Sequence, residues 1–147
     1  MNKFLQNTDL IKLISVALLI LVTSTGCGNV GTNPNVSELV GTSWIITSLN
    51  EAPLIEGTQI TISFEDGKLT GSSGCNIYGS PYTATNTMIT ANGVNNSTKL
   101  CELPEGIMQQ EEIYLDAFSE PLTYEIEDNH LTLTNGKLVM KFSSLSE

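Results

Sequence analysis

The residue types that can do chemistry are few in this chain: three cysteines, one histidine, and one carboxylate in the middle of an apolar segment. The cysteines are Cys27, Cys75 and Cys101, and the histidine is His130. A cysteine can act as a nucleophile, bind a metal, form a disulfide or carry a lipid, and its compartment decides among these. The chemistry of the three cysteines therefore depends on where the chain is delivered.

Cys27 follows a segment with the three parts of an export signal. Two lysines supply positive charge, residues 13–22 form an apolar run, and small residues lead up to Cys27. The run is too short for a permanent membrane span, which needs roughly 20 apolar residues. The segment resembles a bacterial lipobox, in which the cysteine is acylated and becomes the mature N-terminus, although Ser24 stands where leucine is usual. We predict a lipoprotein signal peptide at residues 1–26 and an anchor of acyl chains on Cys27. An ordinary cleaved signal followed by an unmodified cysteine is the alternative.

Lipidation of Cys27 leaves Cys75 and Cys101 as an even pair in an exported chain, where disulfides persist. On the chain-entropy model, closing a loop of this length would stabilise the fold by about 3–3.5 kcal/mol. We therefore predict a disulfide between them. Two unpaired buried thiols are the alternative.

No constellation in the sequence supports catalysis. His130 ends the segment 127–130, which has the composition of a turn, so we expect it on the surface. A zinc site that includes Cys75 and Cys101 would lack a close-spaced pair of ligands. The glycines at residues 71–74 precede a cysteine, whereas those of a phosphate-binding loop precede a helix with a lysine. We predict no catalytic residue, no metal and no cofactor, and hence a protein that is not an enzyme.

The segment 104–119 is the one stretch with a helical period. Apolar side chains recur at i, i+3 and i+4 spacing over residues 107–118, and Pro104 stands near the start. At about 100° per residue, Glu111 falls inside the apolar arc. A carboxylate buried there without partners would be costly. We predict a buried polar clamp in which Glu111 accepts hydrogen bonds from backbone N–H groups of a neighbouring loop or from the Trp44 indole. A ligand-binding carboxylate and an exposed one on a rotated helix are the alternatives.

The rest of the chain predicts short antiparallel strands. Residues 58–64 alternate apolar and polar side chains, and the segments between residues 122 and 142 form a meander with one apolar face. Asp66-Gly67, Asn92-Gly93 and Asn135-Gly136 are turn signals. The expected fold class is α+β: a small antiparallel β-barrel or strongly curled sheet, covered by one amphipathic helix.

The composition of the chain indicates how it is divided into segments and which classes of partner it can bind. Residues 27–38 have little to bury, which predicts a flexible tether, and residues 39–147 have the size of one domain. Four lysines, no arginine and fifteen acids remain after residue 26, so the predicted mature net charge is −11. Such a surface repels phosphate backbones and anionic headgroups. We expect no nucleic-acid partner, and attachment to the membrane through the N-terminal acyl chains.

A set of spaced residues carries a family resemblance. They are Gly41-Thr42-Ser43-Trp44, Leu49-Asn50, Pro53-Leu54, Phe64, Gly67-Lys68, Gly71, Gly74-Cys75-Asn76, Tyr78, Ser97-Thr98, Cys101, Met108, Glu111 and Tyr114-Leu115. Together they resemble the META domain family, to which the heat-inducible lipoprotein HslJ belongs, over about residues 39–142. Glu51 and Ser80 depart from the usual glycines. The resemblance implies a small barrel-like domain, often lipid-anchored in bacterial envelopes and linked with heat shock, and it implies no catalytic residues.

These features predict a non-enzymatic lipoprotein of the bacterial cell envelope that faces the periplasm or the outer surface. It would act by binding an unknown envelope protein or small ligand, or by supporting envelope integrity under stress. The alternative function is an anchored periplasmic inhibitor or a small-ligand-binding barrel, because an acidic surface suits a basic enzyme.

Overall fold

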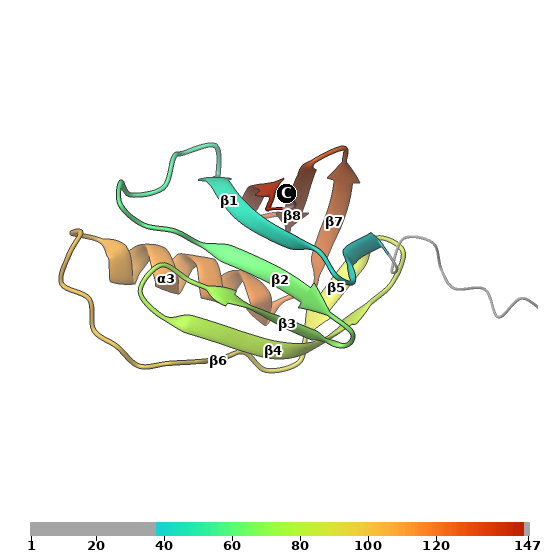
Figure 1. Ribbon diagram of the computed structural model, residues 1–147, viewed down its shortest axis with the longest axis horizontal. Helices are drawn as coiled ribbons and strands as arrows, with labels where there is room; N and C mark the ends of the chain where they lie inside the picture. The colour runs from blue at the N-terminus through green and yellow to red at the C-terminus, as the bar shows by residue number, and fades with distance from the viewer. Residues whose placement is uncertain (1–37, 146–147) are drawn as a thin grey trace, which may run out of the picture. The chain divides into compact units, whose positions relative to one another are not determined.

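The structure is a computed structural model that describes residues 38–145 (Figure 1). The predicted signal peptide at residues 1–26, the lipidation site Cys27 and all of the predicted tether except Glu38 lie outside the described residues. The elements in chain order are β1 (Ser43–Leu49), β2 (Thr61–Glu65), β3 (Lys68–Ser72), β4 (Ile77–Ala84), β5 (Met88–Ala91), β6 (Asn95–Asn96), the helix α3 (Ile107–Asp116), the 3-10 turn η1 (Ala117–Ser119), β7 (Leu122–Glu127), β8 (His130–Thr134) and β9 (Val139–Ser144).

Eight of these strands close into a barrel. Neighbouring strands follow the order β3-β2-β1-β9-β8-β7-β5-β4, and a further pairing between β3 and β4 joins the two ends. All of the pairings are antiparallel. Closure pairs β3 with β4, and among the described strands only the two-residue β6, which pairs with β4 alone, remains at an edge. The predicted small antiparallel barrel with one helix is confirmed.

Local sequence explains most of the strands. In β2 the alternation places Ile62 and Phe64 in the core, both at most 1% exposed. The two-residue turn Asp66-Gly67 then joins β2 to β3, with Gly67 at a φ of 70° that favours glycine. The predicted C-terminal meander is formed by β7, β8 and β9, which pair in sequence order.

The turn signal Asn92-Gly93 does not make a hairpin. The strands on either side of it, β5 and β6, both pair antiparallel with β4, at Tyr82–Ala84 and at Tyr78–Gly79 respectively. The chain therefore bends at Gly93, whose φ is 94°, and continues along the same strand instead of reversing. An Asn-Gly pair, which permits a positive φ, allows either a hairpin or a bend, and the pairing of β5 and β6 with β4 favours the bend.

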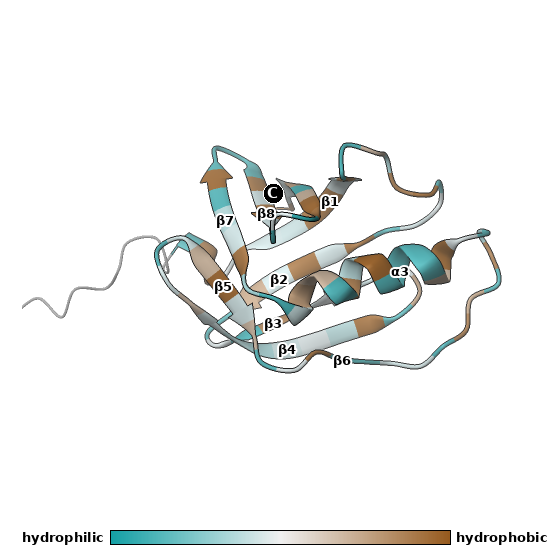
Figure 2. Ribbon diagram, turned by 180° about the vertical axis from the view of Figure 1, so that it is seen from behind, coloured by the Kyte–Doolittle hydropathy of each residue, from teal (hydrophilic) through white to brown (hydrophobic). Residues whose placement is uncertain are grey.

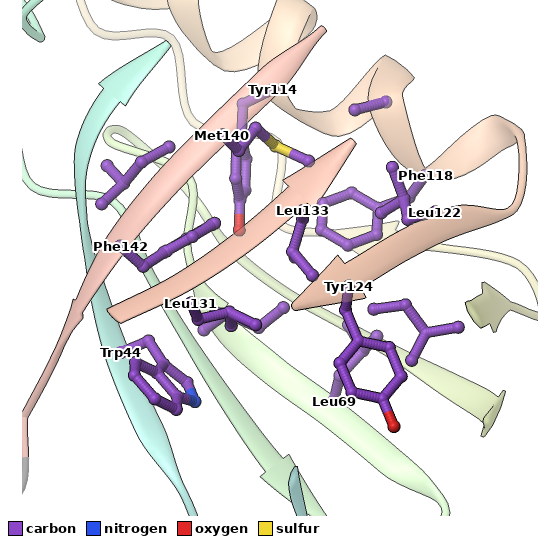
Figure 3. Close-up of a cluster of buried hydrophobic side chains, with 14 of the residues drawn as sticks. Trp44, Leu69, Tyr114, Phe118, Leu122, Tyr124, Leu131, Leu133, Met140 and Phe142 are labelled. Carbon is purple, nitrogen blue, oxygen red and sulfur yellow. The ribbon is translucent and has the colours of Figure 1, made fainter. Parts of the chain in front are cut away.

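Buried apolar side chains from every strand of the barrel fill its interior. Figure 3 shows Leu131, Leu133, Met140 and Phe142 from β8 and β9 in one cluster with Tyr114 from the helix. These side chains are at most 1% exposed. The barrel therefore has a packed core that positions the helix and the loops around it.

The helix α3 begins later than we predicted, and it buries Gln110 besides the predicted Ile107, Glu111 and Tyr114. It starts at Ile107, three residues after Pro104, and its last predicted residues belong to η1. Its buried residues are Ile107, Gln110, Glu111 and Tyr114, so half of the buried face is polar. Figure 2 shows hydrophobic and hydrophilic residues interleaved along the helix. Among residues 38–145, no helix has the length and hydrophobicity of a membrane span.

Candidate functional site

Glu111 lies at the centre of a buried hydrogen-bond network. Its side chain is 4% exposed. Oε2 accepts hydrogen bonds from the Ser73 hydroxyl at 2.6 Å and from the Asn76 backbone N–H at 2.8 Å, and Oε1 accepts one from Asn76 Nδ2 at 2.7 Å. Ser73 and Asn76 lie in the connection between β3 and β4. The carboxylate, with three donors, therefore binds the helix to this connection.

The Asn76 amide extends the network to a third segment. Nδ2 also donates to the Lys99 carbonyl at 3.1 Å, and Oδ1 accepts from the Ser97 hydroxyl at 2.7 Å and from the Lys99 N–H at 2.8 Å. A side-chain amide has two N–H donors and two acceptor sites, and here all four are used. We call Ser73, Asn76, Ser97, Lys99 and Glu111 the Glu111 network.

The neighbouring Gln110 attaches the helix on its other side. Its Oε1 accepts a hydrogen bond from the Ile55 N–H at 2.8 Å, and its Nε2 donates to the Thr58 hydroxyl at 3.0 Å. Ile55 and Thr58 belong to the loop between β1 and β2. Within the described part of the chain, every buried side-chain nitrogen and oxygen has a hydrogen-bond partner. Gln110 and Glu111 thus fix the helix to two loops of the barrel.

Two tyrosines and a phenylalanine pack beneath the helix. Tyr78, Tyr114 and Phe118 have ring centroids 5.4–5.9 Å apart. The two tyrosine hydroxyls hydrogen-bond to each other, and Tyr78 also donates to the Thr61 carbonyl at 3.1 Å. Burial raises the pKa of Tyr114 well above its usual value, and burial followed by the proximity of Tyr114 raises the pKa of Tyr78. Both hydroxyls therefore stay protonated at neutral pH.

A disulfide joins Cys75 to Cys101, with their Cα atoms 6.0 Å apart. Cys75 precedes Asn76 directly, and Cys101 lies two residues after Lys99. The segment before α3 is therefore held covalently next to the place where Asn76 holds it by hydrogen bonds. The structure brings together the two cysteines that we predicted as a pair.

Trp44, which we predicted as a possible hydrogen-bond donor to Glu111, is not one. Its indole N–H donates to the Thr42 hydroxyl at 2.7 Å, two residues earlier in the chain, and so is not a donor to Glu111. The backbone donor that we expected comes from Asn76. We did not predict Ser73 and Asn76 as partners of Glu111, although they lie two residues before and one residue after Cys75, and polar residues beside a disulfide are a usable signal. His130 begins β8 and is exposed, as we predicted.

The second feature is a groove of about 590 Å³ on the outside of the barrel, over β3, β4 and β6. We call it the outer groove. Its main outward-facing residues are Lys68, Thr70, Ile77, Gly79, Pro81 and Asn95. Ile77 is 72% exposed although it is apolar. The arrangement offers an apolar surface with one cation, and so favours binding over acid–base chemistry.

Comparison with known proteins identifies a family and a fold. A family model for the META domain matches residues 37–146. An NMR structure of a protein from Burkholderia xenovorans is 18% identical, with a TM-score of 0.63 over 78% of this chain and 89% of that one. A second NMR structure is 21% identical, with a TM-score of 0.63 over 73% of this chain and 92% of that one. A crystal structure of a DUF4847 family protein from Bacteroides vulgatus is 14% identical, with a TM-score of 0.50 over 74% and 96%. No curated protein matches the chain.

Proposed function

The chain belongs to the META domain family, and we propose that it is a non-enzymatic lipoprotein of the bacterial cell envelope that acts by binding. The domain would be held at a membrane by acyl chains on Cys27 and would face the periplasm or the outer surface. A contribution to envelope integrity under stress, as the HslJ-like members of the family suggest, is part of the same proposal.

The observation that carries the proposal is the disulfide between Cys75 and Cys101. Disulfides persist in oxidising compartments outside the cytoplasm. The pattern of residues 1–26 independently predicts export, and Cys27 at its end has the position of an acylated cysteine. The disulfide and the pattern of residues 1–27 therefore both support a location outside the cytoplasm.

The use of the buried polar groups supports binding rather than catalysis. Glu111 accepts three hydrogen bonds, and Asn76 uses all of its side-chain donors and acceptors. Cys75 and Cys101 have no thiol to act as a nucleophile. These groups stabilise the domain, and the outer groove is a surface on which a ligand can bind.

Mass spectrometry of the protein extracted from membranes tests the proposal. We expect an N-terminal peptide that begins at Cys27 and carries a diacylglyceryl or triacylated mass. The matched variant Cys27→Ala should leave the membrane fraction while its domain stays folded. An unmodified N-terminus at another residue, in a freely soluble protein, would contradict the proposal.

A role under stress has a separate test in the cell. Deletion of the gene should lower survival of its host after heat or envelope stress, and the intact chain should restore it. Complete restoration by Cys27→Ala would show that anchoring is not needed for that role.

A further inference from the structure

We propose that the outer groove binds a single aliphatic chain that ends in an anionic head group. The inference rests on the proposed binding function and names the class of ligand. It is carried by the shape of the groove, by its apolar surface and by the one charge that lines it.

The shape follows from the register of three strands. Lys68 and Thr70 on β3 lie opposite Pro81 and Gly79 on β4, and Gly79 also lies opposite Asn95 on β6. These residues share the outward face, because the residues between them on β3 and β4 are buried. Gly79 has no side chain, so the middle of the row is hollow.

The surface of this hollow suits an aliphatic chain. Ile77 stands on the same face of β4 as Gly79 and is 72% exposed, and Pro81 stands on the other side of Gly79. Removing such apolar surface from water is favourable. The volume of about 590 Å³ lies within the range of roughly 300–1,000 Å³ that small-molecule sites occupy.

The floor of the groove is less suited to an extended peptide. At Tyr78 and Gly79, β4 pairs with β3 on one side and with β6 on the other. A peptide that adds to a sheet needs unpaired N–H and C=O groups along a strand edge. This part of β4 has none to offer, so a peptide strand cannot add to β4 in the floor of the groove.

The charge of the groove is opposite to that of the domain. Lys68 lines the groove and no acidic residue does, although the chain as a whole carries a net charge of −10. Glu65 on β2 lies directly opposite Lys68 in the register of the hairpin but makes no ion pair with it, and the one ion pair among residues 38–145 joins Lys141 to Glu51. The Lys68 ammonium is therefore available to a carboxylate or a phosphate at the end of the chain.

Gly79 allows the groove to be filled without disturbing the fold. A Cβ atom at this position would meet the Leu69 carbonyl oxygen and the Thr70 Cγ2 at 3.5 Å, which are ordinary contacts, and φ at Gly79 is not positive. Gly71 is different, because a Cβ there would lie 1.9 Å from the Thr61 carbonyl oxygen. Gly79→Val is therefore the variant that blocks the groove, and Thr83→Val, on the exposed face of β4 outside the groove, is its control.

Isothermal titration calorimetry on the mature chain, residues 27–147, with Cys27→Ala tests the proposal, since neither an acyl group nor the apolar run of the signal peptide can then occupy the groove. Sodium dodecanoate and dodecanoyl lysophosphatidylglycerol are the two anionic probes, each used below its micelle concentration. We expect binding of dodecanoate, with Kd raised about ten-fold or more by Gly79→Val and changed by less than about two-fold by Thr83→Val. Binding of the lysolipid as well would extend the ligand class to phosphate head groups, and binding of dodecanoate alone would restrict it to carboxylates.

Charge reversal tests the head group. Lys68→Glu should weaken dodecanoate binding about ten-fold and strengthen binding of dodecyltrimethylammonium. Lys137→Glu makes the same change of charge in the exposed turn between β8 and β9 and should leave both affinities unchanged.

The proposal is overturned if neither anionic probe binds the folded parent chain, or if Gly79→Val binds as tightly as the parent. Unchanged affinities in Lys68→Glu would also overturn it. The anchor is measured separately at Cys27, so an acylated chain whose groove binds no probe would refute the ligand class and leave the lipoprotein function standing.

Discussion

The Glu111 network and the outer groove reverse the usual arrangement of polar and apolar groups. In the network, a carboxylate and an amide are buried, and each finds hydrogen-bond partners inside the protein. In the groove, an isoleucine is exposed and a lysine makes no ion pair among the described residues. Buried polar groups with complete partners contribute to stability, whereas surface groups without partners mark a place where another molecule can bind.

The contrast corrects a common inference about buried carboxylates. A buried acid attracts attention as a catalytic or ligand-binding residue, because perturbed acids gather at functional sites. Glu111 is instead occupied by Ser73 and Asn76, and its loss would leave two Asn76 N–H donors without this acceptor, whereas the Ser73 hydroxyl also has the Asn76 carbonyl at 2.9 Å. We therefore expect mutations in the Glu111 network to change the stability of the domain, and mutations in the outer groove to change its binding of a ligand.

The largest effect is expected in Glu111→Ala, which removes the acceptor of three hydrogen bonds. The free energy of unfolding should fall by about 3–4 kcal/mol, since each stranded donor costs about 1–3 kcal/mol and the site relaxes in part. Glu111→Gln keeps an acceptor and should lose about half as much. Denaturant unfolding measures both, with the exposed neighbour Glu112→Ala as a control that should change stability by less than about 0.5 kcal/mol. Equal midpoints in Glu111→Ala and the parent would refute the clamp.

Loss of the disulfide should have the next largest effect. Replacing Cys75 and Cys101 together with serine should lower stability by about 2–4 kcal/mol and leave the fold recognisable, because Asn76 still holds the adjoining segment at Lys99. Urea unfolding of the double variant measures the loss. Thiols in the native exported protein that react with an alkylating agent would contradict the pairing.

The tyrosine pair predicts a loss of stability in alkaline solution. Burial raises the pKa values of Tyr78 and Tyr114 in the folded state above the unfolded value of about 10. Their contribution is complete below pH 10, and it is lost as the pH rises from there toward the folded pKa values, because the unfolded chain releases protons that the folded chain keeps. The slope should approach about 1.4 kcal/mol per pH unit for each tyrosine. Tyr114→Phe should lower the slope of the free energy of unfolding against pH by the contribution of one tyrosine. Parallel plots of that free energy for variant and parent between pH 9 and about 11 would contradict this explanation.

The smallest effect on stability is expected in the groove. Gly79→Val should change the free energy of unfolding by less than about 0.5 kcal/mol, because its Cβ meets only ordinary contacts and valine suits a strand. Thermal unfolding of the purified chain measures it. A large loss of stability would show that Gly79 is needed by the fold, and would remove the contrast between the two regions.

Local sequence patterns predicted much of the barrel and part of the site. The alternation that we predicted over residues 58–64 depends on near neighbours and is present in β2 from Thr61, and the turn at Asp66-Gly67 is present as well. The burial of Glu111 followed from helical spacing. Its partners did not, because Ser73 and Asn76 lie 38 and 35 residues away and meet it only after the barrel has closed.

Two further features could not be predicted for the same reason. The bend at Gly93 and a hairpin at Gly93 have the same local signal, and pairing of β5 and β6 with β4 decides between them. The outer groove combines outward side chains from three strands, and its hollow exists because Gly79 is placed between Thr70 and Asn95. The sequence contains these residues, but only the register brings them together.

An NMR titration of the ¹⁵N-labelled mature chain, residues 27–147 with Cys27→Ala, distinguishes the two regions most directly. Sodium dodecanoate is added below its micelle concentration, and backbone amide shifts are followed. We expect the amide signals of Thr70, Gly79 and Asn95 to shift in proportion to the ligand bound, while those of Ser73 and Asn76 keep their positions. Shifts at Ser73 and Asn76 with none at Gly79 would assign ligand binding to the buried network and contradict the account.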